Sequence, residues 1–355
     1  MRSFLKSKVD VLPEGCLPMR EPPRLADARI RAVIQTHYGL SIVALAFLPI
    51  GNDAASFVYR VTASDGTDFF LKVRTGQGFS APSIAIPRFL HEQAVPHIVT
   101  PVPTLAQTLS VRVSDFVLSL YPFIEARTAT EAGLTDELWH TLGRTLRQIH
   151  ASQLPAELEQ IVSREAFVPS RRHVLTNLES AITNPNLADP VQRELSAFWR
   201  VRQDEIRMVI DRADTLGSWL RQASLPQVLC HADLHTWNVL LDTMQHMWIV
   251  DWDEALLAPK ERDLMFVIKG IGHNLIGPHE TTCFLQGYGD LGIDRQALVY
   301  YRYAWAVQDM AAYAEDVFFS PDLGAQARND SAHAFVELFA PGNIVAIACA
   351  SEIGS

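Results

Sequence analysis

The chain has 355 residues, of which 48% are hydrophobic and 20% are charged, and its formal net charge at pH 7 is −10. This is ordinary globular usage, and the length predicts two or three domain-sized units. The acidic balance and the lack of a Lys/Arg block argue against nucleic acid as a partner, because surfaces that track phosphates are basic. The longest apolar run, Ile42–Ile50, has nine residues, whereas a membrane helix needs roughly 20. We therefore expect neither nucleic acid nor a membrane as a partner.

The first residues and the cysteines bear on localisation. Residues 1–24 contain four Pro and no apolar periodicity, which predicts a loose N-terminal extension without the apolar core of a signal peptide. The cysteines have no CxxC spacing, which favours free thiols over disulfides or a zinc site. They are Cys16, Cys230, Cys283 and Cys349. Both features indicate a cytoplasmic protein.

The segment up to residue 120 is rich in short β-branched and aromatic runs. One helix is expected first, from about Arg24 to Tyr38. A turn of small residues then precedes an alternating strand, and short side chains let backbone N–H groups approach a phosphate closely. The candidate phosphate-binding residues of this turn are Gly51, Asp53 and Ser56.

Lys72 lies within the apolar run Phe69–Val73, just after the hairpin turn predicted at Asp65–Gly66. A Lys in a buried strand is unfavourable without an anionic partner. The context is that of a strand Lys that reaches the α- and β-phosphates of a nucleotide. A Lys that escapes to solvent at a strand edge is the alternative interpretation.

The run Phe116–Ile124 resembles an apolar strand interrupted by Pro. Backbone groups of such a segment could hydrogen-bond an adenine base, which makes Tyr121, Phe123 and Ile124 candidates for nucleotide binding. Beyond this point the apolar residues recur at helical spacing. The predicted helices cover about Thr135–His150, Pro190–Leu220 and 296–319.

The run from His231 to Asn238 places Asp233 five residues before Asn238, and Asp251 follows a second short apolar run. Apolar residues on both sides predict a hairpin of short buried strands with polar groups at their ends. In phosphoryl transfer, one carboxylate accepts the proton of the attacking hydroxyl, while an Asn and a second Asp hold magnesium at the nucleotide phosphates. The spacing matches a kinase catalytic loop, with His-Ala-Asp where protein kinases carry His-Arg-Asp.

Taken alone, this segment admits two other interpretations. Asp and Asn are common in turns, so the spacing can arise by chance. If the segment were a strand, alternation would place His231, Asp233 and His235 on one face, as in a hydrolytic metal centre. The kinase interpretation is favoured because turn, Lys strand, linker, catalytic loop and metal Asp occur in kinase order. A hydrolytic site explains none of the first three.

Two long motifs, Cys230–Leu241 and Ile249–Phe266, are supported by His37–Leu40 and Tyr121–Ile124. On these residues the chain resembles the aminoglycoside phosphotransferases, and most closely their spectinomycin phosphotransferase branch. The resemblance extends from about residue 25 to the C-terminus. It implies an α+β, bilobal, protein-kinase-like fold. The expected lobes are a small β-rich nucleotide-binding lobe and a larger, mainly helical catalytic and substrate-binding lobe, over residues 25–120 and 121–355.

The resemblance also implies roles for individual residues. Asp233 is the expected catalytic base, Asn238 and Asp251 are the expected Mg²⁺ ligands, and Lys72 is the expected phosphate contact. ATP is the expected phosphoryl donor, with GTP as the alternative.

One departure concerns the partner of Lys72. Kinases of this fold usually pair the strand Lys with a Glu on the following helix, but the stretch Ser80–Pro87 has no acid near Ala81, and the first carboxylate is Glu92. Glu92 could substitute, phosphate alone could hold Lys72, or the enzyme could be weakened.

Acidic residues predict the charge of the acceptor. Seven acids against one Lys and one Arg lie between His231 and Asp263, and an acidic cleft attracts a cation. The expected acceptor is therefore a cationic small molecule of the aminocyclitol type. The candidate substrate-binding residues are Asp253 and Glu254, which follow Asp251, and Asp309, four residues after Trp305 on one helical face.

Two functions of different classes follow. The first is a kinase that phosphorylates a hydroxyl of an aminocyclitol or aminoglycoside. The second, motivated by the missing helix Glu, is a kinase-fold protein that binds nucleotide or ligand with little or no turnover.

Overall fold

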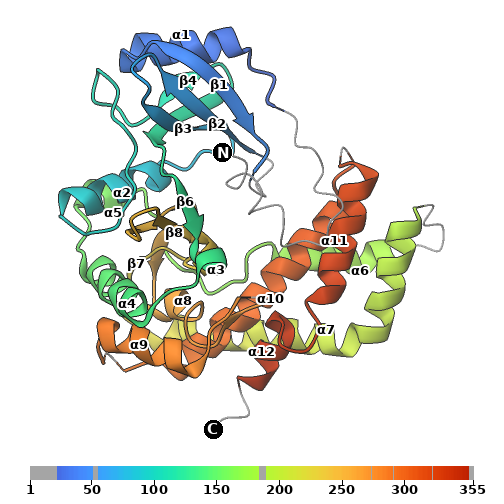
Figure 1. The fold of residues 1–355 in the computed structure, drawn as a ribbon. Coiled ribbons are helices and arrows are strands. Elements are labelled where there is room, and N and C mark those ends of the chain that lie inside the picture. Colours follow the sequence, from blue (N-terminus) through green and yellow to red (C-terminus); the bar gives the residue numbers. More distant parts are fainter. Residues whose placement is uncertain are drawn as a thin grey trace. The chain divides into compact units, whose positions relative to one another are not determined.

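The computed structural model describes residues 22–50, 55–183, 189–272, 274–290, 292–321 and 323–351 (Figure 1). These residues form two compact units. Unit 1 contains the chain up to Ser163 together with Thr236–Ala255, and unit 2 contains Arg164–His235 and the chain from Leu256 onwards. The division into lobes at residue 120 stays a prediction.

A five-stranded antiparallel sheet with strand order β1-β2-β3-β5-β4 dominates unit 1. The hairpin between β2 and β3 turns at the predicted position, where Gly66 has a φ of 86° that suits a residue without Cβ. The bounds of the strands are Ile42–Leu48 (β1), Ser56–Ala63 (β2), Asp68–Thr75 (β3), Val111–Val113 (β4) and Phe116–Pro122 (β5).

Alternation along β3 separates the core from the site. Leu71 and Val73 are fully buried and pack in a core with residues of α1 (Asp27–Tyr38), the helix predicted near this position. Because successive side chains of a strand point to opposite faces, Lys72 and Arg74 lie on the other face of β3.

The rest of unit 1 consists of a second sheet and several helices. The small sheet has strand order β6-β8-β9, and β8 and β9 form an antiparallel hairpin. The bounds of these elements are Pro82–Glu92 (α2), Ala126–Thr128 (β6), Ala129–Ala132 (α3), Asp136–Ala151 (α4), Ala156–Glu159 (α5), Thr236–Asn238 (the 3₁₀ turn η1), Val239–Asp242 (β8) and Met247–Ile249 (β9).

Unit 2 is mainly helical and is built around α10, which packs against α6, α7, α8, α11 and α12. The long helices α4, α7 and α10 lie close to the ranges predicted from the sequence. The bounds of the helices are Arg172–Ile182 (α6), Pro190–Ala223 (α7), Glu261–Leu264 (α8), Pro278–Tyr288 (α9), Arg295–Phe318 (α10), Ala325–Glu337 (α11) and Ile344–Ala350 (α12).

The predicted hairpin of short strands lies after the motif His231–Asn238. Residues 239–242 do pair with residues 247–249, but the strand before the motif, Val228–Cys230 (β7), pairs with Leu256–Ala258 (β10). A second two-stranded sheet joins Gly270–Ile271 (β11) to Asn274–Leu275 (β12). The strands on the two sides of the motif, β7 and β8, therefore belong to different sheets.

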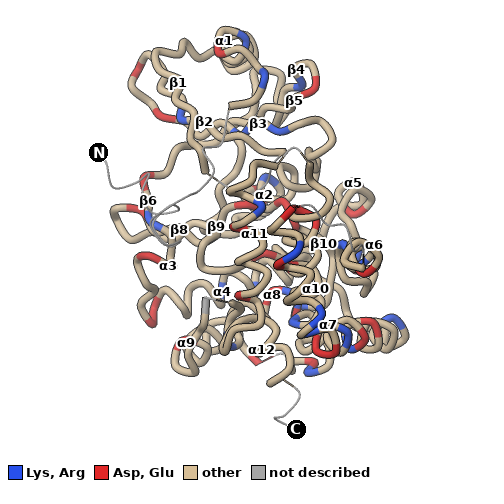
Figure 2. Tube along the Cα trace, turned by 90° about the vertical axis from the view of Figure 1, so that its right-hand side faces the viewer, with Lys and Arg blue, Asp and Glu red and all other residues tan. Residues whose placement is uncertain are grey.

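The structure shows how charges and cysteines are distributed over the described residues. Basic and acidic residues both occur along α7, so this helix carries mixed charge (Figure 2). Three free thiols are described, at Cys230, Cys283 and Cys349, and Cys16 lies outside the described residues. In the described part of the chain, every helix is too short or too polar to cross a bilayer.

The core of unit 1 gives a stability prediction. Leu71→Ala removes a fully buried side chain and should lower the free energy of unfolding by about 2–5 kcal/mol, since it leaves a cavity. Leu105, which is 69% exposed, provides the matched control, and Leu105→Ala should have little effect. Chemical denaturation of both variants measures the difference. Equal losses would contradict this description of the core.

Candidate active site

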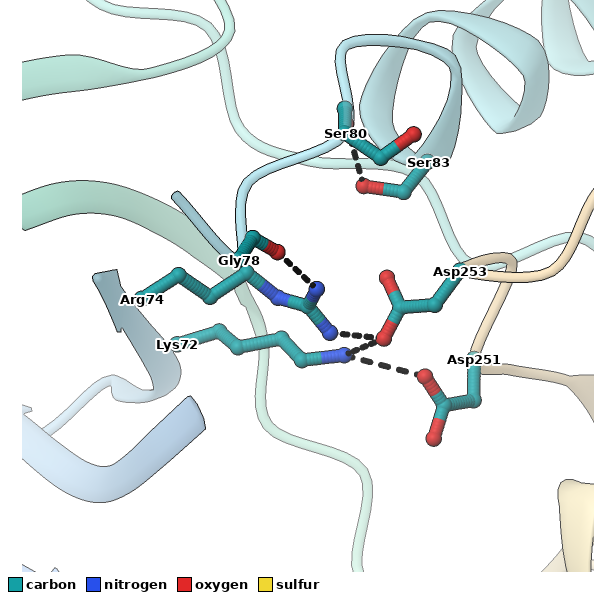
Figure 3. A network of polar contacts seen from close by, with 7 residues as sticks. All are labelled: Lys72, Arg74, Gly78, Ser80, Ser83, Asp251 and Asp253. Atoms are coloured by element: carbon teal, nitrogen blue, oxygen red, sulfur yellow. Dashed lines mark hydrogen bonds and ion pairs between the residues drawn. The ribbon is translucent and has the colours of Figure 1, made fainter. Parts of the chain in front are cut away.

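Two cations on β3 meet two acids that follow β9 (Figure 3). The Nζ atom of Lys72 lies 2.9 Å from Oδ1 of Asp251 and 2.7 Å from Oδ2 of Asp253. Arg74 donates to the same Oδ2 atom of Asp253. Lys72 is thus not a residue that escapes to solvent: its side chain is 17% exposed and in contact with two carboxylates.

Helix α2 provides no acid for Lys72. Its first turn contains none, and where the sequence lacks the expected Glu, the hydroxyl of Ser83 donates to the carbonyl of Ser80 at 2.7 Å (Figure 3). Glu92, at the other end of this helix, forms an exposed ion pair with Arg88 at 2.6 Å. In this structure the partners of Lys72 come from the segment after β9.

Asp251 and Asn238 are brought close by the β8–β9 hairpin. The N–H of Val250 donates to the backbone carbonyl of Asn238 at 3.0 Å, one step beyond the last paired residues of the two strands. Asp251 has a φ of 68°, a left-handed conformation that is uncommon for residues other than Gly and recurs at functional sites. Carboxylate and amide oxygens are hard donors that suit Mg²⁺, so this pair of side chains fits the ion that the sequence implies.

The candidates for nucleotide binding lie at different places in unit 1. Ser56 is buried and pairs in register with Arg74. Tyr121 pairs in register with Phe70 at the end of β5, and desolvation raises the pKa of its phenol. The N–H of Phe123 donates to the carbonyl of Asp68, and the guanidinium of Arg60 lies over its ring. Ile124 follows and is partly buried; Gly51 and Asp53 lie outside the described residues.

Asp233 lies in unit 2, in a loop fixed by a buried carboxylate. Asp263 is fully buried and accepts from the N–H groups of His231 and Ala232 at 2.9 and 2.6 Å. Ala232 has a φ of 66°. The two hydrogen bonds hold this turn in a conformation that an Ala rarely adopts, directly before Asp233.

The alternative of a hydrolytic metal centre is not supported by this loop. Residues 231–235 form no strand, so alternation does not place the three side chains on one face. Nδ1 of His231 accepts from the N–H of Asp233, while Nε2 of His235 lies 3.3 Å from a carboxylate oxygen of Asp233. Among the described residues, the groups of side chains close enough to share one ion do not include this trio.

The remaining substrate-binding candidates differ in their surroundings. Glu254 is exposed, whereas Asp309 on α10 is partly buried. Desolvation raises the pKa of Asp309 from 3.8 to about 7, although a side-chain hydrogen bond from Trp305 acts in the opposite direction. The protonation state of this carboxyl group therefore changes near neutral pH.

Sequence analysis assigned no role to Arg74 or Asp263. A signal for Arg74 was available, because a residue two positions after Lys72 on the same strand must lie on the same face. The contact between Asp263 and the catalytic loop had no such signal, since 30 residues separate Asp233 from Asp263 along the chain.

A family model described as the phosphotransferase enzyme family matches residues 47–331. The chain belongs to this family. Protein StrN of Streptomyces griseus is 24% identical to this phosphotransferase over 290 residues, which are 79% of the chain and 81% of the relative.

Solved structures agree with this identification. A spectinomycin phosphotransferase in complex with ADP and spectinomycin is 32% identical to the chain, with a TM-score of 0.83, over 93% of this phosphotransferase and 99% of that protein. An AMP-bound complex of a spectinomycin phosphotransferase has a TM-score of 0.78 at 32% identity, over 92% and 98% of the two chains. The resemblance, the kinase-like fold and the assignment as a phosphotransferase are therefore confirmed.

The two hydrogen bonds from backbone N–H groups to Asp263 give a testable prediction. Asp263→Asn replaces one accepting oxygen with an NH₂ group, so one of the two buried N–H groups loses its partner, at a cost of about 1–3 kcal/mol. Hydrogen exchange at His231 and Ala232 should accelerate, and the denaturation midpoint should fall. The control is Asp290→Asn, which alters an exposed acid that also accepts one backbone N–H. If the two variants behaved alike, Asp263 would not anchor the loop.

Proposed function

We propose that the chain transfers the γ-phosphoryl group of ATP to a hydroxyl of a cationic small molecule of the aminocyclitol type, with spectinomycin-like compounds as the first class to test. The observation that carries the proposal is the likeness, at 32% identity over nearly the whole chain, to a phosphotransferase solved with ADP and spectinomycin. The gathering of Lys72 and Arg74 with the acids after β9 supports it. GTP is a second donor to test.

Lys72 binds the phosphates of the nucleotide in this proposal. An ammonium on a strand is held by the sheet, and charged hydrogen bonds to phosphate are stronger than neutral ones. Backbone groups near Tyr121, Phe123 and Ile124 would hold the base, while Ser56 and the turn with Gly51 and Asp53 would lie at the phosphates. Asn238 and Asp251 would hold Mg²⁺, which when bound neutralises charge on the β- and γ-phosphates.

Asp233 is the proposed base. Its carboxylate would accept the proton of the acceptor hydroxyl and orient the oxygen toward the phosphorus. The loop that carries it is fixed by Asp263, which supports this role because a general base must be held within hydrogen-bond reach of its proton.

Two acidic residues, Glu254 and Asp309, are proposed to bind the acceptor. Glu254 is exposed, and Asp309 accepts a side-chain hydrogen bond from Trp305. A carboxylate suits an ammonium group, because opposite charges attract. The free thiols of Cys230 and Cys283 support a cytoplasmic location, where ATP is also supplied.

A second candidate function is nucleotide or ligand binding with little or no turnover. The lack of an acid in the first turn of α2 favours it. The presence of Asp233, Asn238 and Asp251 favours the enzyme.

Replacement of the base tests the proposal. Asp233→Asn should reduce kcat by about 10²–10⁴-fold while the nucleotide affinity stays within a few-fold of the wild type, because the nucleotide contacts lie elsewhere. Steady-state transfer to spectinomycin and calorimetric titration of nucleotide measure the two effects, with Asp290→Asn as the control. Near wild-type turnover in Asp233→Asn would remove this residue from catalysis.

The pKa of Asp309 gives a pH prediction. Since desolvation raises this pKa to about 7, the ionised fraction of the carboxyl group increases as the pH rises through neutrality. For an acceptor whose amine keeps its proton, kcat/KM for the acceptor should therefore rise with pH through about 7. Asp309→Asn should remove that rise and leave the KM for nucleotide unchanged. A variant with the same pH profile as the wild type would exclude Asp309 from acceptor binding.

A further inference from the structure

Asp253 is shared by two cations of β3, Lys72 and Arg74. Lys72 and Arg74 both contact the same carboxylate oxygen of Asp253, and Lys72 also contacts Asp251. Asp253 is also the less exposed of the two acids, at 23% against 43% of its side chain. The two acids of the Asp-Trp-Asp motif thus have different surroundings.

Arg74 is built to hold Asp253 in place. It is 6% exposed, and its Nη1 atom donates to the carbonyl of Gly78 at 2.9 Å (Figure 3). Gly78 in turn has no room for a side chain, because a Cβ atom there would lie 2.5 Å from Cβ of Ala55. The guanidinium is therefore fixed at one end by the backbone and presents its other end to Asp253.

We propose that Asp253, held by Arg74, is the carboxylate that positions Lys72 for the nucleotide, in the place that an acid of the helix after the Lys strand takes elsewhere in this fold. The inference rests on the proposed function. It makes Asp253 and Arg74 positioning residues, which act on the nucleotide through Lys72.

Electrostatics favours different roles for Asp251 and Asp253. A carboxylate that binds a metal ion has less charge to offer an ammonium group, so the proposed duty of Asp251 leaves Asp253 as the steady partner of Lys72. One carboxylate between two cations leaves one positive charge in excess, which suits a polyphosphate. The acid of α2, Glu92, is already in contact with Arg88.

The proposal gives Asp253 a different role from the one its sequence position suggests, and the two roles predict different kinetics. A positioning acid affects the nucleotide, whereas a substrate-binding acid affects the KM for the acceptor. Simple charge counting makes a third prediction: loss of an acid beside a phosphate site should tighten nucleotide binding.

The first experiment compares Asp253→Asn with Glu92→Gln as a matched loss of one carboxylate. Calorimetric titration with ATP or its non-hydrolysable analogue and Mg²⁺ gives the nucleotide affinity, and steady-state kinetics give both KM values. We expect Asp253→Asn to lower kcat/KM for nucleotide by about tenfold or more, the scale of one charged hydrogen bond, with the acceptor KM unchanged. Glu92→Gln should match the wild type.

A double-mutant cycle tests whether Arg74 acts through Asp253. Arg74→Gln should weaken nucleotide binding in the wild-type background and have little further effect in Asp253→Asn, because residues that share one function are not additive. Thermal unfolding of each variant separates this effect from a loss of fold. A merely structural role would lower the thermal stability, but the effects of Arg74→Gln and Asp253→Asn on nucleotide affinity would then be additive.

Several results would overturn the inference: tighter nucleotide binding in Asp253→Asn, a rise in the acceptor KM alone, an equal loss in Glu92→Gln, or additive effects in the cycle. Each of these leaves the proposed function standing, because the wild type still binds nucleotide and transfers phosphate. If the wild type bound no nucleotide, the proposed function and the inference would fail together.

Discussion

An ammonium group on a strand of a packed sheet is unfavourable unless an anion lies beside it, and Lys72 meets two carboxylates after β9. This contact joins segments 179 and 181 residues apart in the chain. It ties the five-stranded sheet to the β8–β9 hairpin and sets where a nucleotide phosphate could be bound. Arg74 contacts one of the two carboxylates, Asp253, and the other, Asp251, is a proposed metal ligand.

Backbone strain is found in both motifs that hold the proposed base and the proposed metal ligand. Ala232 and Asp251 each have a φ near +67°, a region that disfavours side chains with a Cβ atom. In the first case two amides donate to the buried Asp263, and in the second the turn follows the paired strand β9. Such conformations persist only where the surrounding structure over-determines them, so the two turns are held as rigid supports for Asp233 and Asp251.

The sequence predicted what local spacing determines. The helices α4, α7 and α10 and the turn before β3 follow from apolar periodicity and turn residues. The residues of the motifs Cys230–Leu241 and Ile249–Phe266 carried the resemblance to the family. The pairing of β7 with β10 was not predicted, because three apolar residues do not specify which distant strand they join. Arg74 and Asp263 were missed for a related reason: their partners, at Asp253 and at residues 231–232, are set by tertiary contacts rather than by neighbours in the chain.

The central claim is that the chain transfers phosphate to a cationic small molecule. A single-turnover experiment with wild-type enzyme in excess, Mg²⁺ and ATP labelled on the γ-phosphate tests it most directly, with spectinomycin, other aminocyclitols and a neutral sugar as acceptors. We predict that the label moves to a hydroxyl of a cationic aminocyclitol, as shown by the mass of the product. Label that stays on ATP, or appears only as inorganic phosphate with every acceptor, would contradict the account.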